Sequence, residues 1–166
     1  MKRILIIGCC GAGKSTLAQQ LGERLRLPVY HLDRLYWRKD WARTPSDEWK
    51  RVVQNLCATA EWIIDGNYAS TMDLRLSACD TVIFLDYPRR VCLWRILKRR
   101  IFYHRRARSD IADGCSERIT WAFLRWVWCY RRDYRPELLA KLNALDKNVT
   151  VLAFSDPTQT AKALLK

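Results

Sequence analysis

The chain has 166 residues, of which 49% are hydrophobic, and a formal net charge of +13. This length suits one domain with its own core, residues 1–166, and the apolar content excludes an intrinsically disordered chain. No apolar run approaches the ~18–20 residues of a membrane-spanning helix, so no association with a membrane is expected.

Strand and helix patterns alternate through the first part of the chain. Apolar residues predict a strand over 3–7, and a helix is expected over 14–26, ending before a proline. A short extended piece is expected over 29–33. The pair Thr44-Pro45 then indicates a helix start, with Thr44 as the N-cap and Pro45 as the first helical residue.

The same alternation continues to the end of the chain. We expect strands at 62–66, 81–86 and 149–154, helices at 72–79, 88–102, 116–134 and from 157, a loop at 103–116, and a turn or helix at 136–145. This order predicts an α/β fold with a parallel sheet, in which ligands bind beyond the carboxyl ends of the strands. Gly8, Asp33, Asp65 and Asp86 lie at such ends, so we expect them to converge on one crevice.

The run Gly-Cys-Cys-Gly-Ala-Gly-Lys-Ser at 8–15 matches the phosphate-loop pattern G-x-x-x-x-G-K-[ST] in full. Its glycines let backbone N–H groups turn toward phosphates, and the following helix presents its positive N-terminus. Lys14 is expected to reach the β- and γ-phosphates of ATP as a catalytic residue, and the Ser15 hydroxyl to bind Mg²⁺. The predicted nucleotide-binding residues are Gly8, Gly11, Ala12, Gly13, Lys14, Ser15 and Thr16.

Two carboxylates are candidates for the Mg²⁺ side of the site. Asp65 follows three apolar residues and Asp86 follows four, and Mg²⁺ prefers oxygen ligands. We favour Asp65, because Gly66 after it allows a ligand to approach closely. Asp86 is the second candidate, and either acid has the alternative role of capping the next turn.

A third carboxylate, Asp33, is predicted to hold the acceptor hydroxyl, as a catalytic base or as a positioning group. Arg34 and Gly66 are predicted to line the same substrate site. Arg75, on a predicted helix, is expected to bind an acceptor phosphate or carboxylate. The alternatives are a capping or salt-bridged Asp33 and a surface Arg75, and His31 is assigned no role.

The segment 89–135 holds fourteen Lys and Arg against four acids, a net charge of +10, which suits anionic partners. Arg105, Arg106 and Arg108 are predicted catalytic residues, because a loop that closes over the transferring phosphoryl group can stabilise its charge. Arg125, on the following helix, is predicted to lie beneath that lid. A solvated helix face is the alternative for each arginine.

The seven cysteines are odd in number and contain no C-x-x-C pair. They indicate reduced thiols in the cytoplasm. The first three residues lead directly into the strand and the phosphate loop, so a cleaved signal peptide would remove the site and none is expected. Cys9 and Cys10 lie inside the loop, where oxidation would interfere with nucleotide binding.

Longer motifs in the middle of the chain are more specific. They are Trp62–Tyr68, Leu85–Arg89, Leu93–Arg95, Gly114-Cys115 with Glu117, and Phe123–Trp126. These motifs resemble the FlaR-type family named "DNA topology modulation protein", within the adenylate-kinase-related P-loop kinases. The resemblance implies a three-layer P-loop NTPase fold with a five-stranded parallel sheet in the order 2-3-1-4-5. It also implies an acceptor-binding region near 30–60 and a basic helical lid near 100–118.

Together these features predict an ATP- and Mg²⁺-dependent phosphotransferase for a small molecule, with nucleosides and nucleotides among the candidate acceptors. The alternative is a nucleotide-dependent DNA-binding protein that modulates DNA topology. No helix-turn-helix, zinc-finger or RNA-binding signature occurs in the sequence, so any DNA binding is expected to be weak or nonspecific. The sequence leaves the acceptor and the oligomeric state open.

Overall fold

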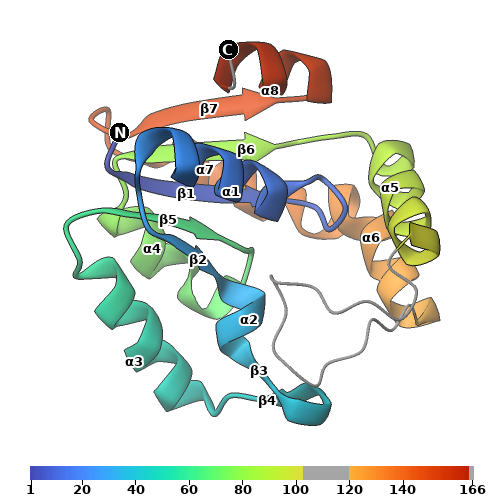
Figure 1. Cartoon of the computed structure of the whole chain (residues 1–166), viewed down its shortest axis with the longest axis horizontal. Coiled ribbons are helices and arrows are strands. Elements are labelled where there is room, and N and C mark those ends of the chain that lie inside the picture. The colour runs from blue at the N-terminus through green and yellow to red at the C-terminus, as the bar shows by residue number, and fades with distance from the viewer. Residues whose placement is uncertain (103–119, 165–166) are drawn as a thin grey trace.

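The computed structural model describes residues 1–102 and 120–164 and is built on a central parallel sheet (Figure 1). Its strands are β1 (Arg3–Gly8), β2 (Val29–His31), β5 (Trp62–Asp65), β6 (Thr81–Leu85) and β7 (Thr150–Phe154). They lie in the order β2-β5-β1-β6-β7, and each neighbouring pair is parallel. Numbered within this sheet alone, the order is 2-3-1-4-5, which confirms the prediction.

Helices cover both faces of the sheet, as the continuous apolar runs of its strands require. On β1, Ile4 and Ile6 belong to one core, whereas Leu5 and Ile7 belong to the other. The first core includes residues of α1 (Lys14–Leu25), α5 (Arg89–Phe102), α6 (Trp121–Asp133) and α8 (Pro157–Leu164). The second includes residues of α3 (Ser46–Cys57), α4 (Met72–Ala78) and α7 (Arg135–Asn143). The predicted three-layer α/β architecture is confirmed.

The register of the strands brings the predicted site residues to one edge of the sheet. Gly8, the last residue of β1, pairs with Leu85 of β6, and Ile6 pairs with Asp65 of β5. Asp65 also pairs with His31, the last residue of β2. The loops that follow β1, β2, β5 and β6 therefore leave the sheet at the same edge.

The extended piece at 29–33 is shorter than predicted. β2 ends at His31, and Asp33 lies in the first turn of α2 (Leu32–Tyr36) instead of at the end of a strand. The reason is Leu32, whose side chain is fully buried in the second core, so the chain turns inward at this point. A small antiparallel sheet follows, in which η1 (Lys39–Trp41) joins β3 (Trp37–Arg38) to β4 (Ala42–Arg43).

Thr44 is not the N-cap that the sequence predicts. α3 begins at Ser46, after Pro45, and no side chain caps it. Thr44 instead donates its N–H and its hydroxyl to the carbonyl of Tyr36, at 3.0 and 2.6 Å. These two bonds close the base of the β3–β4 hairpin, so the hydroxyl serves the hairpin and not the helix.

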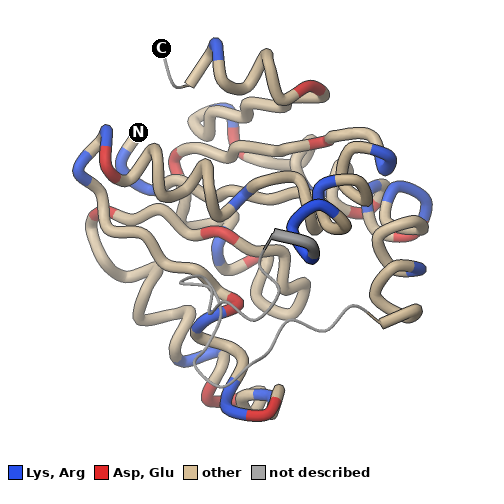
Figure 2. The backbone as a smooth tube through the Cα atoms, turned by 45° about the vertical axis from the view of Figure 1, so that its right-hand side comes forward, with Lys and Arg blue, Asp and Glu red and all other residues tan. Residues whose placement is uncertain are grey.

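Basic residues recur along α5 and in the last turn of α6 (Figure 2). α5 begins at Arg89, one residue after its predicted start, and ends at Phe102 as predicted. α6 begins at Trp121, because Thr120 is extended and its hydroxyl accepts the N–H of Phe123 at 3.1 Å. The rest of the predicted start of this helix, and the predicted loop at 103–116, lie outside the described residues. None of the described helices has the length and apolar content needed to cross a membrane.

Candidate active site

The segment between β1 and α1 has the backbone geometry of a phosphate loop. Gly8, Gly11 and Gly13 have φ angles of 143°, 81° and 93°, a region that residues with a side chain rarely adopt. Lys14 begins α1, and its Nζ donates to the carbonyl of Cys9 at 3.2 Å. The lysine is therefore folded back over the loop, where it would contact a phosphate bound by the loop.

The N-terminus of α1 is arranged to attract an anion. No acidic residue lies in its first turn, and no side-chain hydrogen bond caps it. Ser15 and Thr16 follow Lys14 in this turn and place two hydroxyl groups beside the loop. The N-terminus of α1 thus combines free N–H groups, the positive end of the helix dipole and the ammonium of Lys14.

Helix α5 supports the loop from outside. A Cβ added to Gly11 would lie 2.4 Å from the carbonyl oxygen of Cys92, so the loop rests directly on the α5 backbone. Arg95 of the same helix donates through Nη1 to the carbonyl of Ala12 at 2.9 Å. This contact of Arg95 gives no signal in the sequence, because nothing local marks which arginine of a basic helix faces inward.

Asn67, in the segment after β5, clamps the start of the loop. Its Oδ1 accepts the N–H of Gly8 at 3.1 Å, and its Nδ2 donates to the carbonyl of Gly8 at 2.8 Å. The amide thereby extends the pairing of β5 with β1 by one more step. No local pattern points to Asn67, since its partner lies 59 residues away in the chain.

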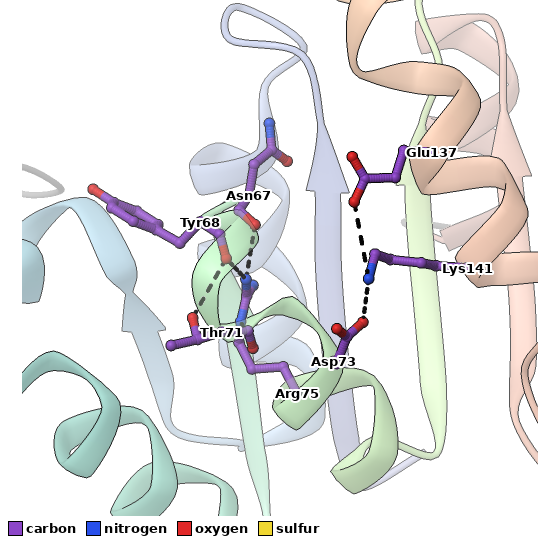
Figure 3. Close-up of polar contacts among 7 residues, drawn as sticks. All are labelled: Asn67, Tyr68, Thr71, Asp73, Arg75, Glu137 and Lys141. Atoms are coloured by element: carbon purple, nitrogen blue, oxygen red, sulfur yellow. Dashed lines mark hydrogen bonds and ion pairs between the residues drawn. The ribbon is translucent and has the colours of Figure 1, made fainter. Parts of the chain in front are cut away.

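Arg75 has a different role from the one predicted. It is fully buried, and its guanidinium donates to the carbonyls of Gly66, Asn67, Tyr68 and Thr71 at 2.7, 2.8, 2.8 and 3.2 Å (Figure 3). Burial lowers its pKa to about 10, so it remains charged at neutral pH. Arg75 lies on the short helix α4, and its side chain turns back toward the preceding segment, residues 66–71. Arg75 therefore braces this segment and does not face an acceptor.

The two metal candidates have different surroundings. Asp65 is 3% exposed, and its Oδ1 lies 2.8 Å from Nδ1 of His31. Asp86 is held by Arg135 of α7, whose Nε lies 2.9 Å from both carboxylate oxygens and whose Nη2 lies 2.7 Å from Oδ2. Arg131 of α6 lies 3.7 Å from the same Oδ2. Asp86 is thus engaged in ion pairs with two helices, whereas Asp65 is paired with a single imidazole.

Asp33 is exposed, as an acceptor-binding carboxylate should be, and so is its neighbour Arg34. The hydroxyl of Tyr68 donates to Oδ1 of Asp33 at 2.7 Å. Burial and the negative charge of Asp33 raise the pKa of Tyr68, so its hydroxyl stays protonated and keeps donating. The Tyr68 ring packs against Tyr36 and Trp49, with centroids 4.6 and 5.0 Å away, which fixes the direction of the hydroxyl.

The phosphate loop and Asp33 converge at the thiol of Cys10. Its pKa is raised by burial and by the negative charge of Asp33, and lowered by the positive charges of Lys14 and Arg99. Charges must lie near a group to shift its pKa in this way. Lys14, Asp33 and Arg99 of α5 therefore all act electrostatically on this one thiol.

The predicted lid is only partly described. Arg125 lies on α6 and is exposed, among the residues that the helix presents to solvent. Arg105, Arg106 and Arg108 lie outside the described residues. The lid stays a prediction.

No model of a known protein family matches the chain. It is 31% identical over 133 residues to the uncharacterized protein YqaC of Bacillus subtilis, an alignment that covers 78% of this chain and 72% of YqaC. The resemblance to FlaR-type proteins stays a prediction.

Solved kinase structures share the fold. A gluconokinase from Sinorhizobium meliloti matches with a TM-score of 0.53 and 15% identity, over 99% of this chain and 90% of that one. A shikimate kinase from Bacteroides thetaiotaomicron matches with 0.52 and 15%, over 99% and 94%. A deoxyadenosine kinase from M. mycoides with bound dCTP matches with 0.51 and 14%, over 98% and 96%. At these identities the likeness shows the fold alone, which is the P-loop NTPase fold.

Proposed function

Because the chain belongs to the family of YqaC from Bacillus subtilis and has the P-loop NTPase fold, we propose that it is an ATP-dependent phosphotransferase. It transfers the γ-phosphoryl group to a hydroxyl of a small molecule. The observation that carries this proposal is that two adjacent residues contact the two ends of the site, since Asn67 bonds Gly8 of the phosphate loop and Tyr68 bonds Asp33. A phosphate-binding cation and an exposed carboxylate then face the two substrates of a kinase.

At the nucleotide end, the loop N–H groups and Lys14 hold the β- and γ-phosphates, which fixes the γ-phosphorus for attack. Ala12 lies in the same loop, and Thr16 lies in the first turn of α1. The donor set also fits Mg²⁺, since the Ser15 hydroxyl and the Asp65 carboxylate are hard oxygen ligands at the same edge of the sheet. When bound there, Mg²⁺ neutralises charge on the phosphate oxygens. Asp65 is the proposed carboxylate of this site, because Asp86 is occupied by Arg135.

At the acceptor end, Asp33 accepts a hydrogen bond from the acceptor hydroxyl. As that oxygen attacks the γ-phosphorus, the bond from phosphorus to the ADP oxygen breaks and the hydroxyl proton passes to Asp33. Tyr68 holds the carboxylate in place through its hydrogen bond to Oδ1. Arg34 and Gly66 are proposed to line this end of the site, and the acceptor class stays open between nucleosides, nucleotides and other small hydroxyl compounds.

The proposed lid completes the charge balance. Arg105, Arg106 and Arg108, with Arg125 beneath them, would place guanidinium groups on the transferring phosphoryl group. Arg99, in the last turn of α5, contributes positive charge near the loop within the described residues. The DNA-binding alternative gains no support from the fold or from the similar proteins.

The test is ADP formation from Mg·ATP with a panel of nucleosides, nucleotides and small hydroxyl metabolites. We expect one acceptor class to raise ADP formation above the rate of hydrolysis by water, and Lys14→Ala to abolish that increase. Lys50→Ala, at an exposed lysine of α3, is the matched control and should behave as wild type. A wild-type protein whose thermal stability does not rise with Mg·ATP would contradict nucleotide binding itself.

A further inference from the structure

His31 and Asp65 form a hydrogen-bonded pair that the proposed reaction does not yet explain. They are register partners on the neighbouring strands β2 and β5, at the carboxyl edge of the sheet (Figure 1). The Nδ1–Oδ1 distance is 2.8 Å, and the two side chains are 17% and 4% exposed. The pair thus lies at the edge where the phosphate loop begins, largely shielded from water.

The chemistry of the pair fixes its direction. An ionised carboxylate only accepts hydrogen bonds, so Nδ1 of His31 carries the hydrogen and donates to Oδ1 of Asp65. Among the described residues, no hydrogen bond reaches Oδ2 of Asp65. In residues 1–102 and 120–164, one oxygen of the carboxylate is therefore anchored, and the other accepts no hydrogen bond.

The contrast with Asp86 shows what such an anchor achieves. Arg135 binds both oxygens of Asp86 through a charged guanidinium, which opposes the charge of the carboxylate and occupies both oxygens. A single imidazole N–H fixes the rotation of Asp65 and occupies one oxygen. Of the two acids, Asp65 keeps an oxygen for a metal or its bound water.

We propose that His31 is a positioning residue for Mg·ATP, which holds Asp65 so that Oδ2 is directed at the metal side of the phosphate loop. The inference rests on the proposed function, since it takes Asp65 and Ser15 as the residues that meet Mg²⁺. Partners that orient metal-binding groups typically contribute 10–100-fold to metal affinity. His31 acts through Asp65 and contacts neither substrate.

The experiment measures how much Mg²⁺ tightens the binding of a non-hydrolysable ATP analogue. Calorimetry gives the dissociation constant with Mg²⁺ and with EDTA, and their ratio is the metal-dependent gain. We expect His31→Ala to lower this gain by about 10-fold and to leave the affinity in EDTA within about 2-fold of wild type. Asp65→Asn is the reference and should lower the gain at least as far.

Two further variants separate positioning from a structural role. In His31→Asn the amide nitrogen occupies the place of Nδ1, whereas in His31→Gln it occupies the place of Nε2. We expect the first to restore most of the gain and the second to restore little. Because both variants keep a polar group, this comparison stays decisive where His31→Ala unfolds, which thermal melting will show.

The possible failures are distinguishable. An unchanged gain in His31→Ala, or equal gains in the Asn and Gln variants, would overturn the positioning role alone. A wild-type gain near one would also overturn it, since no metal-dependent contact would then exist. A wild-type protein that does not bind the analogue in either condition would instead overturn the proposed function.

Discussion

The side-chain amide of Asn67 satisfies both the N–H and the C=O of Gly8, the first residue of the phosphate loop. An amide can do this because it carries a donor and an acceptor side by side, as a backbone peptide does. The loop therefore begins from a fixed point, attached to β5 as well as to β1.

Replacing Asn67 tests this attachment. Asn67→Ala removes two hydrogen bonds of about 1 kcal/mol each, so we expect ATP affinity to fall by roughly 10-fold as the loop loses its fixed start. Asn67→Asp should bind ATP more weakly still, because a carboxylate cannot donate to the Gly8 carbonyl and repels phosphate. Calorimetric titration with an ATP analogue measures both. The matched control is Asn55→Ala, at an exposed position of α3, and equal affinities for the two alanine variants would contradict the clamp.

Tyr68 is expected to affect the acceptor and not the nucleotide. Tyr68→Phe keeps the ring contacts with Tyr36 and Trp49 but removes the hydrogen bond to Asp33. We predict a rise of about 5-fold in KM for the acceptor found in the panel, and an ATP dissociation constant within about 2-fold of wild type. Tyr134→Phe, at a 46% exposed tyrosine, should change neither value. A selective loss of ATP affinity in Tyr68→Phe would contradict this prediction, because Tyr68 would then act on the nucleotide.

Arg75 should matter most for stability. Arg75→Ala leaves carbonyls of the 66–71 segment without their donor and opens a cavity, so we expect unfolding to become easier by about 4 kcal/mol. Urea denaturation measures this change. Asp73→Ala is the control on the same helix, because it removes only an exposed ion pair with Lys141 at 2.5 Å (Figure 3), and exposed ion pairs contribute little to stability. Similar losses in the two variants would show that the buried bonds contribute little.

The lid prediction can be tested by its effect on turnover. Replacing Arg105, Arg106 and Arg108 together by glutamine should leave ATP affinity within about 3-fold of wild type and lower kcat by roughly 10²–10³-fold, as the loss of charge stabilisation in a transition state does. Single-turnover and steady-state ADP formation measure both quantities.

The control for the lid variant removes the same charge elsewhere. Arg24, Arg26 and Arg51 are exposed on or next to α1 and α3, away from the phosphate loop. Their triple replacement by glutamine should leave kcat unchanged. If both triple variants lowered kcat equally, the effect would belong to net charge and not to the lid.

The phosphate loop could be predicted from the sequence because its chemistry is contiguous. Eight consecutive residues contain the glycines, the lysine and the hydroxyl that a nucleotide needs, and their place between a strand and a helix is a local pattern. The sheet order followed from the resemblance to P-loop kinases. The predicted bounds of β2 were wrong, because Leu32 is buried in the core. The predicted start of α3 was wrong, because the Thr44 hydroxyl donates to a carbonyl eight residues away.

The remaining site residues depend on distant partners. Arg75 was predicted to meet an acceptor, since its position on a helix after Asp65 does not show which way the guanidinium turns. His31 and Asn67 gave no signal of their own, because their partners lie 34 and 59 residues away. Only the strand register brings these groups together.

Asn67 and Tyr68 are neighbours in the chain, and their side chains point to different sides of the segment (Figure 3). One contacts the phosphate loop and the other contacts Asp33. The spacing between the two halves of the site is therefore set by a single peptide unit, about 3.8 Å between Cα atoms. Arg75 donates to the carbonyls of both residues, which fixes this spacing. An acceptor whose length does not match this spacing would be excluded by the backbone itself.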